Sequence, residues 1–397
     1  MRVRMPSRKL KWGVKMKITA VKTFIFNANF RNWLFVKVET DAGIHGWGEA
    51  TVEGYELASE AAVKTMSQHF IGKDPHNIEL LWNTIYRDSY WRSLIIVSAL
   101  GGIEMALWDI LGKSLNLPVY QLLGGAFRSK IQAYNNAWYF SAKKLEDYPK
   151  LASEAVALGF KHLKWDPFWP SDVFIEPERI SQSKKCVQLV REAVGPDVQL
   201  LIECHGRFSP DRAIHIAREI EEYKPYFFEE PVPPDNIDAL VKVASSIKIP
   251  VATGERLCSH WGARQILEKN GAAILQPDII HIGGILETKK LAAMAHTYYI
   301  PIAPHNASGP VLAAACIHVD ASTPNFLIQE FFYPDKPLYD EILKEPFFFP
   351  KGGFFDLPTR AGLGVDLDEK ALSKRPYQYY NLGNQFASLE EFAGKKG

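Results

Sequence analysis

The sequence is poor in the features that mark several common classes of protein. Only four of its 397 residues are cysteines, and no two of them form a C-x-x-C pair. We therefore expect neither a disulfide framework nor a cysteine-based zinc module, and a reducing compartment such as the cytoplasm fits this usage. Lys and Arg total 46 against 45 Asp and Glu, which gives a net charge of +1. A chain so balanced has no overall field that would recruit nucleic acid or an anionic membrane.

Long apolar runs and nucleotide-binding motifs are also missing. The longest uncharged, apolar-rich stretch, about residues 93–103, is interrupted by Glu104, so we expect no membrane-spanning segment. Residues 1–16 are basic and lack the apolar stretch of a signal peptide, so we interpret them as an extension. Neither G-x-G-x-x-G after a strand nor G-x-x-x-x-G-K-[ST] occurs, which argues against an open nucleotide-binding sheet. We expect a cytoplasmic protein with a small-molecule ligand and no nucleic-acid or membrane partner.

The spacing of apolar residues changes twice along the chain. Residues 18–49 alternate as in an antiparallel meander. From about 55 to 117 the spacing becomes three and four, as for Leu100, Ile103 and Leu107, which predicts helices. We therefore predict an α+β domain over residues 17–128, with strands first and helices second.

Beyond residue 128, short apolar strands alternate with amphipathic helices. Eight strand–helix units between residues 129 and 350 predict a (β/α)₈-type barrel. The candidate strands are 131–134, 162–165, 198–202, 226–228, 251–253, 274–276, 302–303 and 326–328. Residues 351–397, rich in Gly, Pro and aromatics at their start, are predicted to be a tail that returns to the first domain.

Three consecutive predicted strands end in a carboxylate. Glu203, Glu229 and Glu255 follow one another 26 residues apart, one strand–helix unit each. In a barrel, reactive side chains collect at the carboxyl ends of the strands, so these three should converge. Converging carboxylates repel one another and need a cation to be ionised together. An all-oxygen set favours a hard divalent ion such as Mg²⁺.

The later strands end in groups suited to proton transfer. His305 and Asp278 follow neighbouring strands, and a carboxylate beside an imidazole fixes its tautomer and raises its basicity, as a general base requires. His205, two residues past Glu203, would approach from the other side of the barrel as a general acid. Glu330 could exchange a hydrogen bond with the developing negative charge.

These motifs together resemble the enolase superfamily, in its mandelate racemase-like branch, and most closely the sugar-acid dehydratases acting on galactonate and gluconate. The resemblance covers about residues 17–370. The matching barrel segments are ECHGR (203–207), EEPV (229–232), GER (254–256), LQPD (275–278), APHN (303–306) and QE (329–330), and those of the first domain are ALWD (106–109) and LLGG (122–125).

The resemblance implies a modified TIM barrel, (β/α)₇β, covered by an α+β N-terminal capping domain. It also implies a homo-oligomer with one Mg²⁺ per subunit, held by Glu203, Glu229 and Glu255. In the same arrangement, the pair of His305 and Asp278 would be the base, His205 the acid, and Glu330 the partner of the enolate oxygen.

The sequence departs from the branch at two places. Glu203 stands where Asp is more common, and Asp166 of the segment 164–166 stands where racemases carry a second lysine. A racemase needs a proton relay on both faces of the α-carbon, so the loss of that lysine favours one-sided β-elimination.

The predicted activity is therefore that of a lyase (hydro-lyase) that dehydrates an aldonate to a 2-keto-3-deoxy acid. Lys164 would neutralise the substrate carboxylate, and Asp166, Asn136 and Trp138 would meet the sugar hydroxyls. In the capping domain, Tyr90 to Arg92 are candidates for closing the site. Two alternatives are open: an epimerase, racemase or cycloisomerase of a related acid sugar, and a non-catalytic sugar-acid binder.

Overall fold

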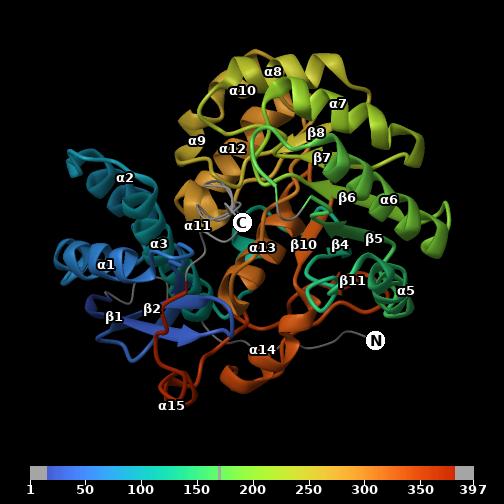
Figure 1. Ribbon diagram of the computed structural model, residues 1–397. Coiled ribbons are helices and arrows are strands. Elements are labelled where there is room, and N and C mark those ends of the chain that lie inside the picture. The colour runs from blue at the N-terminus through green and yellow to red at the C-terminus, as the bar shows by residue number, and fades with distance from the viewer. Residues whose placement is uncertain (1–15, 169–170, 381–397) are drawn as a thin grey trace, which may run out of the picture.

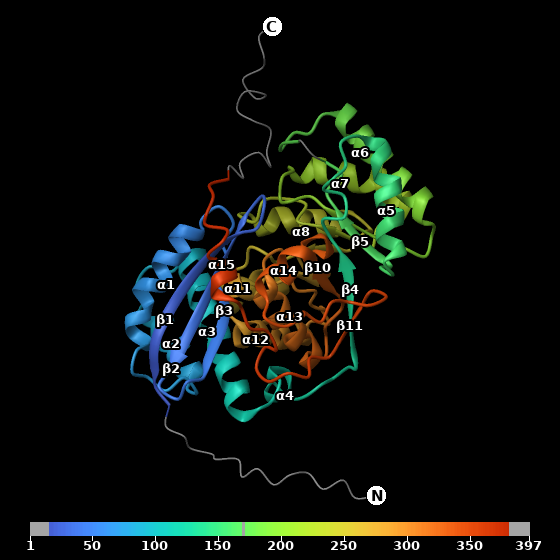
Figure 2. The same ribbon diagram turned by 90° about the horizontal axis from the view of Figure 1, so that it is seen from below.

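The computed structural model describes residues 16–168 and 171–380. Most of the extension predicted over residues 1–16, and the end of the tail, lie outside this range. The described chain forms a cap with a small antiparallel sheet beside a larger barrel, seen on the left and right of Figure 1 and from below in Figure 2.

The cap begins with the predicted meander. Its strands are β1 (Ile18–Asn27), β2 (Asn32–Thr40) and β3 (His45–Glu49). β2 pairs antiparallel with both neighbours, so the sheet order is β1-β2-β3. Residues of β2 are buried along almost its whole length because α1 and α3 cover one face, while Trp33 and Phe35 of the other face belong to a core cluster that includes barrel residues.

Four helices complete the cap. They are α1 (Glu56–Phe70), α2 (Ile78–Asp88), α3 (Leu94–Leu115) and α4 (Val119–Leu122). Helix α3 lies between the cap sheet and the barrel, and glycines permit the close approach on both sides. A Cβ on Gly102 would lie 2.7 Å from Cβ of Ala50, and one on Gly101 would lie 2.7 Å from the carbonyl oxygen of Ile280.

Helix α3 alone among the described helices is long and apolar enough to cross a membrane. The sequence predicts no such segment, because Glu104 interrupts the apolar stretch at residues 93–103. Most of its residues are buried inside the protein, and Glu104 and Asp109 are among them. Its apolar character is therefore that of a helix packed on several sides.

The barrel is a parallel sheet that closes on itself. Its strands are β4 (Lys130–Asn135), β5 (His162–Trp165), β6 (Gln199–Glu203), β7 (Phe227–Glu229), β8 (Val251–Thr253), β9 (Ile274–Leu275) and β10 (Gln329–Phe331). β10 pairs parallel with β4. The seventh strand position is held by single bridges, from Ile302 to Leu275 on one side and to Phe326 on the other. This closure confirms the predicted (β/α)₇β barrel with an α+β cap.

Helices follow the strand positions on the outside. They are α5 (Tyr148–Ala157), α6 (Pro177–Val194), α7 (Pro210–Ile220), α8 (Ile237–Ser246), α9 (Ser259–Gly262), α10 (Arg264–Glu268), α11 (Ile279–Ile282), α12 (Ile285–Thr297), α13 (Pro310–Ser322) and α14 (Lys336–Ile342). Short 3₁₀ turns cover Leu145–Asp147, Glu221–Tyr223 and Tyr333–Asp335. Helix α7 has an N-cap, since the Ser209 side chain accepts from Arg212 N.

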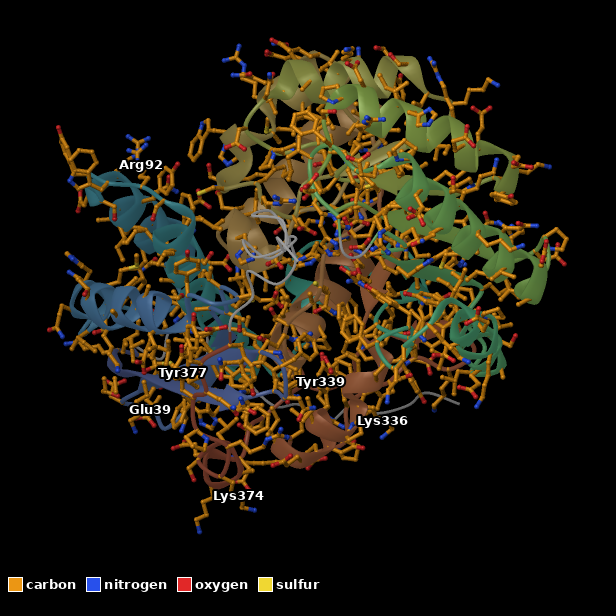
Figure 3. All side chains as sticks on the ribbon, in the orientation of Figure 1. Glu39, Arg92, Lys336, Tyr339, Lys374 and Tyr377 are labelled. Atoms are coloured by element: carbon orange, nitrogen blue, oxygen red, sulfur yellow. The ribbon has the colours of Figure 1, made fainter. Side chains whose placement is uncertain are left out.

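The end of the described chain joins barrel and cap. β11 (Phe354–Asp356) pairs antiparallel with β4, so the predicted tail first completes the barrel sheet. It then returns to the cap, where Asp366 accepts a hydrogen bond from Trp47 Nε1 (2.6 Å) and α15 (Glu369–Leu372) places Glu369 2.6 Å from Lys37 Nζ. Tyr339 of α14, labelled in Figure 3, adds an aromatic contact to Trp33 of the cap, with ring centroids 5.7 Å apart.

One layer of side chains inside the barrel explains where the site forms. Seven strand positions each contribute an apolar residue to a single buried cluster: Tyr134, Leu201, Phe227, Ala252, Ile274, Ala303 and Ile328. β5 contributes Lys164, which pairs in register with Leu201. Because strand side chains alternate with a period of two, the residues two positions further on face the same interior, at the carboxyl ends of the strands.

Candidate active site

Three carboxylates gather at the carboxyl ends of β6, β7 and β8. Glu203 and Glu229 are the last residues of their strands and pair in register. Glu255 follows β8 after Gly254, whose φ of +141° takes the chain out of the strand, and a Cβ at Gly254 would lie 2.9 Å from Gln276 N. One carboxylate oxygen from each of the three lies within 4.8 Å of the others. The sequence-predicted ligands therefore do converge.

Lys164 lies among these carboxylates. Its Nζ is 2.6 Å from Glu229 Oε1, 3.2 Å from Glu203 Oε2 and 2.8 Å from Glu330 Oε1, and its side chain is buried. Burial alone would lower the pKa of Lys164, but the charges of Glu229 and Glu330 outweigh it and hold this pKa well above its usual value. Lys164 is thus an ammonium ion that balances part of the negative charge.

The ammonium of Lys164 does not balance the charge of all the carboxylates around it. Burial and the neighbouring Glu203 raise the pKa of Glu229 well above its usual value, and Glu229 Oε2 is buried without a hydrogen-bond partner among the residues that the structure describes. For Glu203, burial is outweighed by the charges of His205 and Lys164, which lower its pKa. An unpartnered buried carboxylate oxygen beside two further carboxylates fits a hard divalent cation bound by oxygen ligands.

His305 and Asp278 form the predicted pair. His305 Nδ1 lies 2.8 Å from Asp278 Oδ2, and the two residues are joined by a parallel bridge. Asp278 Oδ1 accepts from the N–H groups of Ile280 and His281, so the carboxylate also caps α11. Asp278 is thereby held in place by its own helix while it orients the imidazole.

The other ring nitrogen of His305 faces the carboxylate cluster. His305 Nε2 lies 3.6 Å from Glu255 Oε2 and 3.8 Å from Glu330 Oε2. Burial would lower the pKa of His305, but the charges of Glu255 and Glu330 and the hydrogen bond to Asp278 raise it well above its usual value. The imidazole is therefore oriented by Asp278, and the neighbouring carboxylates favour its protonated form.

Glu330 is held by backbone and side-chain donors. Its Oε2 accepts from Asn306 N (2.9 Å), and its Oε1 accepts from Asn136 Nδ2 (2.7 Å). Burial would raise the pKa of Glu330, but Lys164 and His305 outweigh it and lower this pKa. Glu330 therefore lies between Lys164 and His305, beside the cluster.

His205 approaches the cluster from a turn that follows β6. β6 ends at Glu203, and His205 lies in a turn with φ of +51°, where its backbone N–H donates to Glu203 Oε1 (2.6 Å). Its Nδ1 lies 2.8 Å from Asp166 Oδ2, and its side chain is one-third exposed. Burial would lower the pKa of His205, but Glu203 and Asp166 raise it to about 9.

Asp166, Asn136 and Trp138, the predicted hydroxyl contacts, direct their polar atoms to protein groups. Asp166 accepts from His205, Arg207 and Phe168 N. Trp138 Nε1 donates to the carbonyl oxygen of Lys164 (2.9 Å), and Asn136 Oδ1 accepts from Ala137 N. All three therefore support the residues around the cluster in this structure.

A second pair of charges borders the site. Arg256 contacts Glu230, and its Nε lies 3.7 Å from Glu255 Oε1. Burial and Glu255 raise the pKa of Glu230 to about 8. Arg256 thus pairs with carboxylates at the edge of the cluster, whereas Arg207 pairs with Asp166.

The cap covers the barrel loops through the turn between β1 and β2, which sequence analysis did not single out. Phe30 packs edge-on against Phe140 of the loop after β4, with ring centroids 5.3 Å apart, and the buried Arg31 pairs with Asp335 beyond β10. Tyr90 to Arg92, which were the predicted closing residues, lie elsewhere. Arg92, labelled in Figure 3, lies at the outer edge of the cap, and its guanidinium carbon lies 4.6 Å from the centroid of the Tyr86 ring.

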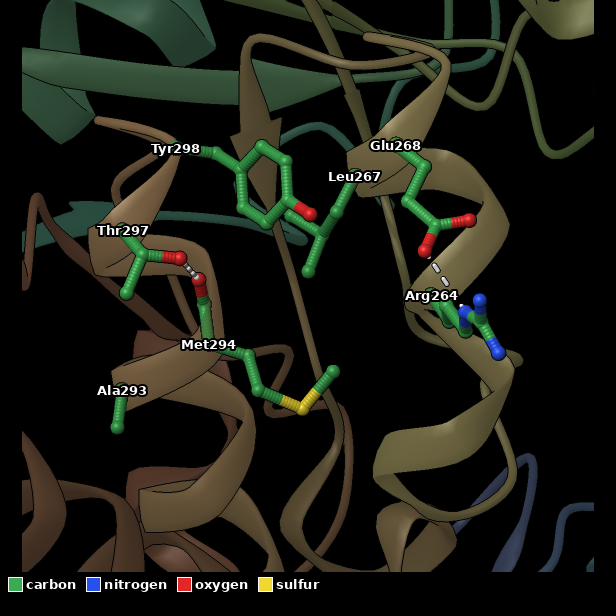
Figure 4. Close-up of a pocket in the computed structure, with 7 residues that line it drawn as sticks. All are labelled: Arg264, Leu267, Glu268, Ala293, Met294, Thr297 and Tyr298. Carbon is green, nitrogen blue, oxygen red and sulfur yellow. Dashed lines mark hydrogen bonds and ion pairs between the residues drawn. The ribbon is translucent and has the colours of Figure 1, made fainter.

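The outer helices also form a groove, away from the strand ends. It lies between α10 and α12 and is lined by Leu267 and Met294 with the ion pair of Arg264 and Glu268 at its side (Figure 4). None of the residues discussed above lines it. The groove is therefore separate from the carboxylate cluster at the strand ends.

Comparison with known proteins agrees with this geometry. Residues 2–124 match the family described as mandelate racemase / muconate lactonizing enzyme, N-terminal domain, and residues 147–371 match the enolase C-terminal domain-like family. Two curated relatives, the D-galactonate dehydratases of Cronobacter sakazakii (strain ATCC BAA-894) and Ralstonia pickettii (strain 12J), are each 37% identical over 366 residues, which cover 91% of this chain and 94% of the relative. Their name agrees with the predicted sugar-acid dehydratase class.

Solved structures resemble the whole chain. A mandelate racemase/muconate lactonizing enzyme from Sulfitobacter sp. is 36% identical with a TM-score of 0.87, covering 91% of this chain and 96% of that one. A member of the enolase superfamily from Salmonella Typhimurium is 32% identical with a TM-score of 0.86, covering 91% and 98%. The barrel, the cap and these matches together show that the chain belongs to the enolase superfamily, in its mandelate racemase and muconate lactonizing enzyme family.

Proposed function

We propose that this protein is a Mg²⁺-dependent hydro-lyase that converts an aldonate, such as galactonate, into a 2-keto-3-deoxy acid. One observation carries the proposal. Two histidines, His205 and His305, approach one carboxylate cluster from the third and seventh strand positions, and each binds a buried carboxylate through Nδ1 at 2.8 Å. The name shared by the two curated relatives supports the substrate class.

Glu203, Glu229 and Glu255 would hold the metal ion. When bound, a Mg²⁺ ion would offset the ligand charges and stabilise the negative charge that develops on the substrate carboxylate during enolisation. A bound cation would offset part of the charge of Glu255, so this contribution to the raised pKa of His305 would be smaller and the imidazole would come closer to the range of a general base.

His305 would remove the proton from C2 through Nε2, because Nδ1 is engaged by Asp278. Lys164 and Glu330 border the position where the enolate oxygens would form, and the ammonium of Lys164 would balance their charge. His205 would then give a proton from Nε2 to the departing 3-hydroxyl, so that the C3–O bond breaks, water leaves, and the enol product tautomerises to the keto acid.

Asp166 supports elimination in this scheme through His205. It accepts a hydrogen bond from His205 Nδ1 and is itself paired with Arg207. Asp166 therefore acts as a positioning residue for the acid, in place of the sugar-hydroxyl contact predicted from sequence. A base at this position on the racemase pattern would be a lysine, so the carboxylate favours elimination over racemisation.

The test is a screen of aldonic and aldaric acids for Mg²⁺-dependent formation of a semicarbazide-reactive keto acid. We expect turnover of at least one aldonate, which disappears with EDTA and returns with Mg²⁺. Exchange of the C2 proton for deuterium without keto-acid formation would instead indicate an epimerase or cycloisomerase. Binding of an acid sugar with neither exchange nor product would indicate a non-catalytic binder.

A further inference from the structure

Glu49, the last residue of cap strand β3, caps a helix of the barrel. Its Oε1 accepts from Gly309 N (2.6 Å) and its Oε2 from Leu312 N (2.9 Å), while Thr51 Oγ1 donates to Oε1 (3.0 Å). The carboxylate is fully buried. Helix α13 begins at Pro310, and the first N–H groups of a helix need an acceptor from outside it. A residue of the cap fills this role, 260 positions away in sequence.

The N-cap residue of α13, Gly309, leaves room for the Glu49 carboxylate. Gly309 has no side chain that could cap the helix itself, and a Cβ at this position would lie 2.9 Å from Glu49 Oε1 and 3.0 Å from the ring of Phe35. The missing side chain therefore leaves the space that the carboxylate fills. Gly309 and Glu49 act as a matched pair.

The segment that Glu49 holds begins at His305. Asn306 N donates to Glu330 Oε2 at one end of the short loop, and Gly309 N donates to Glu49 at the other. The seventh strand position is otherwise made of single bridges. The backbone around His305 therefore forms few sheet contacts, and two buried carboxylates, Glu330 and Glu49, hold it in place.

Glu104 of α3 provides an internal comparison. It accepts from Ile285 N (2.8 Å) and Leu286 N (3.0 Å) at the start of α12, whose N-cap is again a glycine, Gly284. Helix α11 separates this cap from Asp278, and Asp278 caps α11 with its own side chain. The chemistry of the two caps is the same, but only Glu49 holds the backbone next to a proposed catalytic residue.

We propose that Glu49 is a positioning residue for His305, so that the cap domain sets the geometry of the general base from behind the barrel wall. The proposal rests on the role of His305 given above. In this arrangement, a residue of the cap domain helps to position the base that removes the C2 proton.

The test compares Glu49→Gln with the matched variant Glu104→Gln. Each substitution replaces one acceptor oxygen by an NH₂ group that faces a helix N–H, so both should lower thermal stability. We expect Glu49→Gln to lower kcat and C2 proton exchange together, by on the order of 10- to 100-fold, with KM and the Mg²⁺ affinity within about two-fold of wild type. Glu104→Gln should keep kcat near the wild-type value.

Hydrogen–deuterium exchange of the backbone gives a readout that does not depend on the substrate. Glu49→Gln should expose residues 305–312, and Glu104→Gln should expose residues 284–288 instead. If the wild type turns over no acid sugar, the proposed function fails while this comparison still decides the role of Glu49. Gly309→Ala, which crowds the carboxylate, should act like Glu49→Gln and serves if that variant does not fold. Unchanged kcat and unchanged protection of residues 305–312 in a folded Glu49→Gln or Gly309→Ala protein would overturn the proposal.

Discussion

The candidate site forms a ring at the carboxyl ends of the barrel strands, and the two halves of this ring are built differently. In the half formed by β6, β7 and β8, consecutive strands pair in register, and Glu203 lies directly beside Glu229 in the sheet. In the half that carries Asp278 and His305, β9 has two residues and the seventh position has single bridges. The helices behind this second half, α12 and α13, are capped by Glu104 and Glu49 of the cap.

The difference shows in which half of the site the barrel can position the functional side chains without contacts from the cap. Regular strand pairing determines both the height and the direction of Glu203 and Glu229, and Glu255 lies two residues past the end of β8, so the barrel itself places the three carboxylates. Where pairing is sparse, loops have more freedom, and their functional residues need outside support. The proposed metal-binding half should therefore tolerate disturbance of the cap better than the proposed base half.

The largest effect should come from the metal half. Glu229→Gln removes one of three proposed ligands and leaves a neutral amide in a buried site. We expect keto-acid formation to become undetectable and the Mg²⁺ affinity, measured by calorimetry, to fall by more than about 100-fold. Glu268→Gln, on the exposed outer face of α10, is the control and should bind Mg²⁺ as the wild type does. Wild-type Mg²⁺ affinity in Glu229→Gln would contradict the assignment.

His305→Asn should break the base half alone. Removing a general base typically costs on the order of 10² to 10⁴-fold in rate. We expect both dehydration and C2 deuterium exchange, followed by NMR, to fall together, while the Mg²⁺ affinity stays close to that of the wild type. Retention of C2 exchange would show that another group abstracts the proton.

His205→Asn should separate the two proton transfers. His205 gives its proton only after C2 has been deprotonated, so we expect elimination to fall by a comparable factor of about 10² to 10⁴, while C2 exchange in deuterium oxide persists. Full turnover of the true substrate by this variant would show that His205 is not the acid.

Asp166→Asn should lower the rate of elimination less than His205→Asn does, because Asp166 acts only through His205. The amide can still contact Arg207, but it no longer offers His205 a carboxylate, and burial would lower the pKa of the imidazole without that charge. We expect kcat for elimination to fall by roughly 10-fold and C2 exchange to remain. An equal loss of both would place Asp166 in proton abstraction instead.

The smallest effect concerns the stability of α13, which carries no proposed catalytic group. Burial lowers the pKa of His318 to about 4 from its ordinary value of 6.5. The unfolded chain therefore binds this proton more readily, so the stability that His318 contributes is present above pH 6.5 and is lost as the pH falls toward 4. Between pH 8 and 5 this amounts to about 2 kcal/mol.

Urea unfolding of His318→Gln should show this loss as a shallower decrease of the unfolding free energy between pH 8 and 5 than in the wild type. His215→Gln, an exposed position on α7 in the other half, should keep the wild-type slope. Equal slopes in all three proteins would show that His318 takes up no extra proton on unfolding.

Much of this fold could be predicted because the barrel repeats a local pattern. The predicted strands 162–165 and 251–253 coincide with β5 and β8. Elsewhere the boundaries differ: Glu203 and Glu229 end their strands rather than follow them, and the segment 302–303 contributes a single bridge. Strand ends depend on how the neighbouring strands are staggered, which no local pattern contains.

The site itself divides in the same way. Regular spacing was enough to bring Glu203, Glu229 and Glu255 together, and to pair Asp278 with His305. The partner of Asp166 could not be predicted, because His205 reaches it only through a turn with positive φ.

By itself, the sequence determined the barrel, its order of strand ends and the residue types that line them, because alternation and the repeated strand–helix unit are local. Only the tertiary structure decided how those residues are held. Lys164 balances three carboxylates from three other strands, and Glu49 and Glu104 of the cap close the starts of two barrel helices. Buried charges and helix ends must find partners wherever folding brings them, and such partners have no fixed distance along the chain.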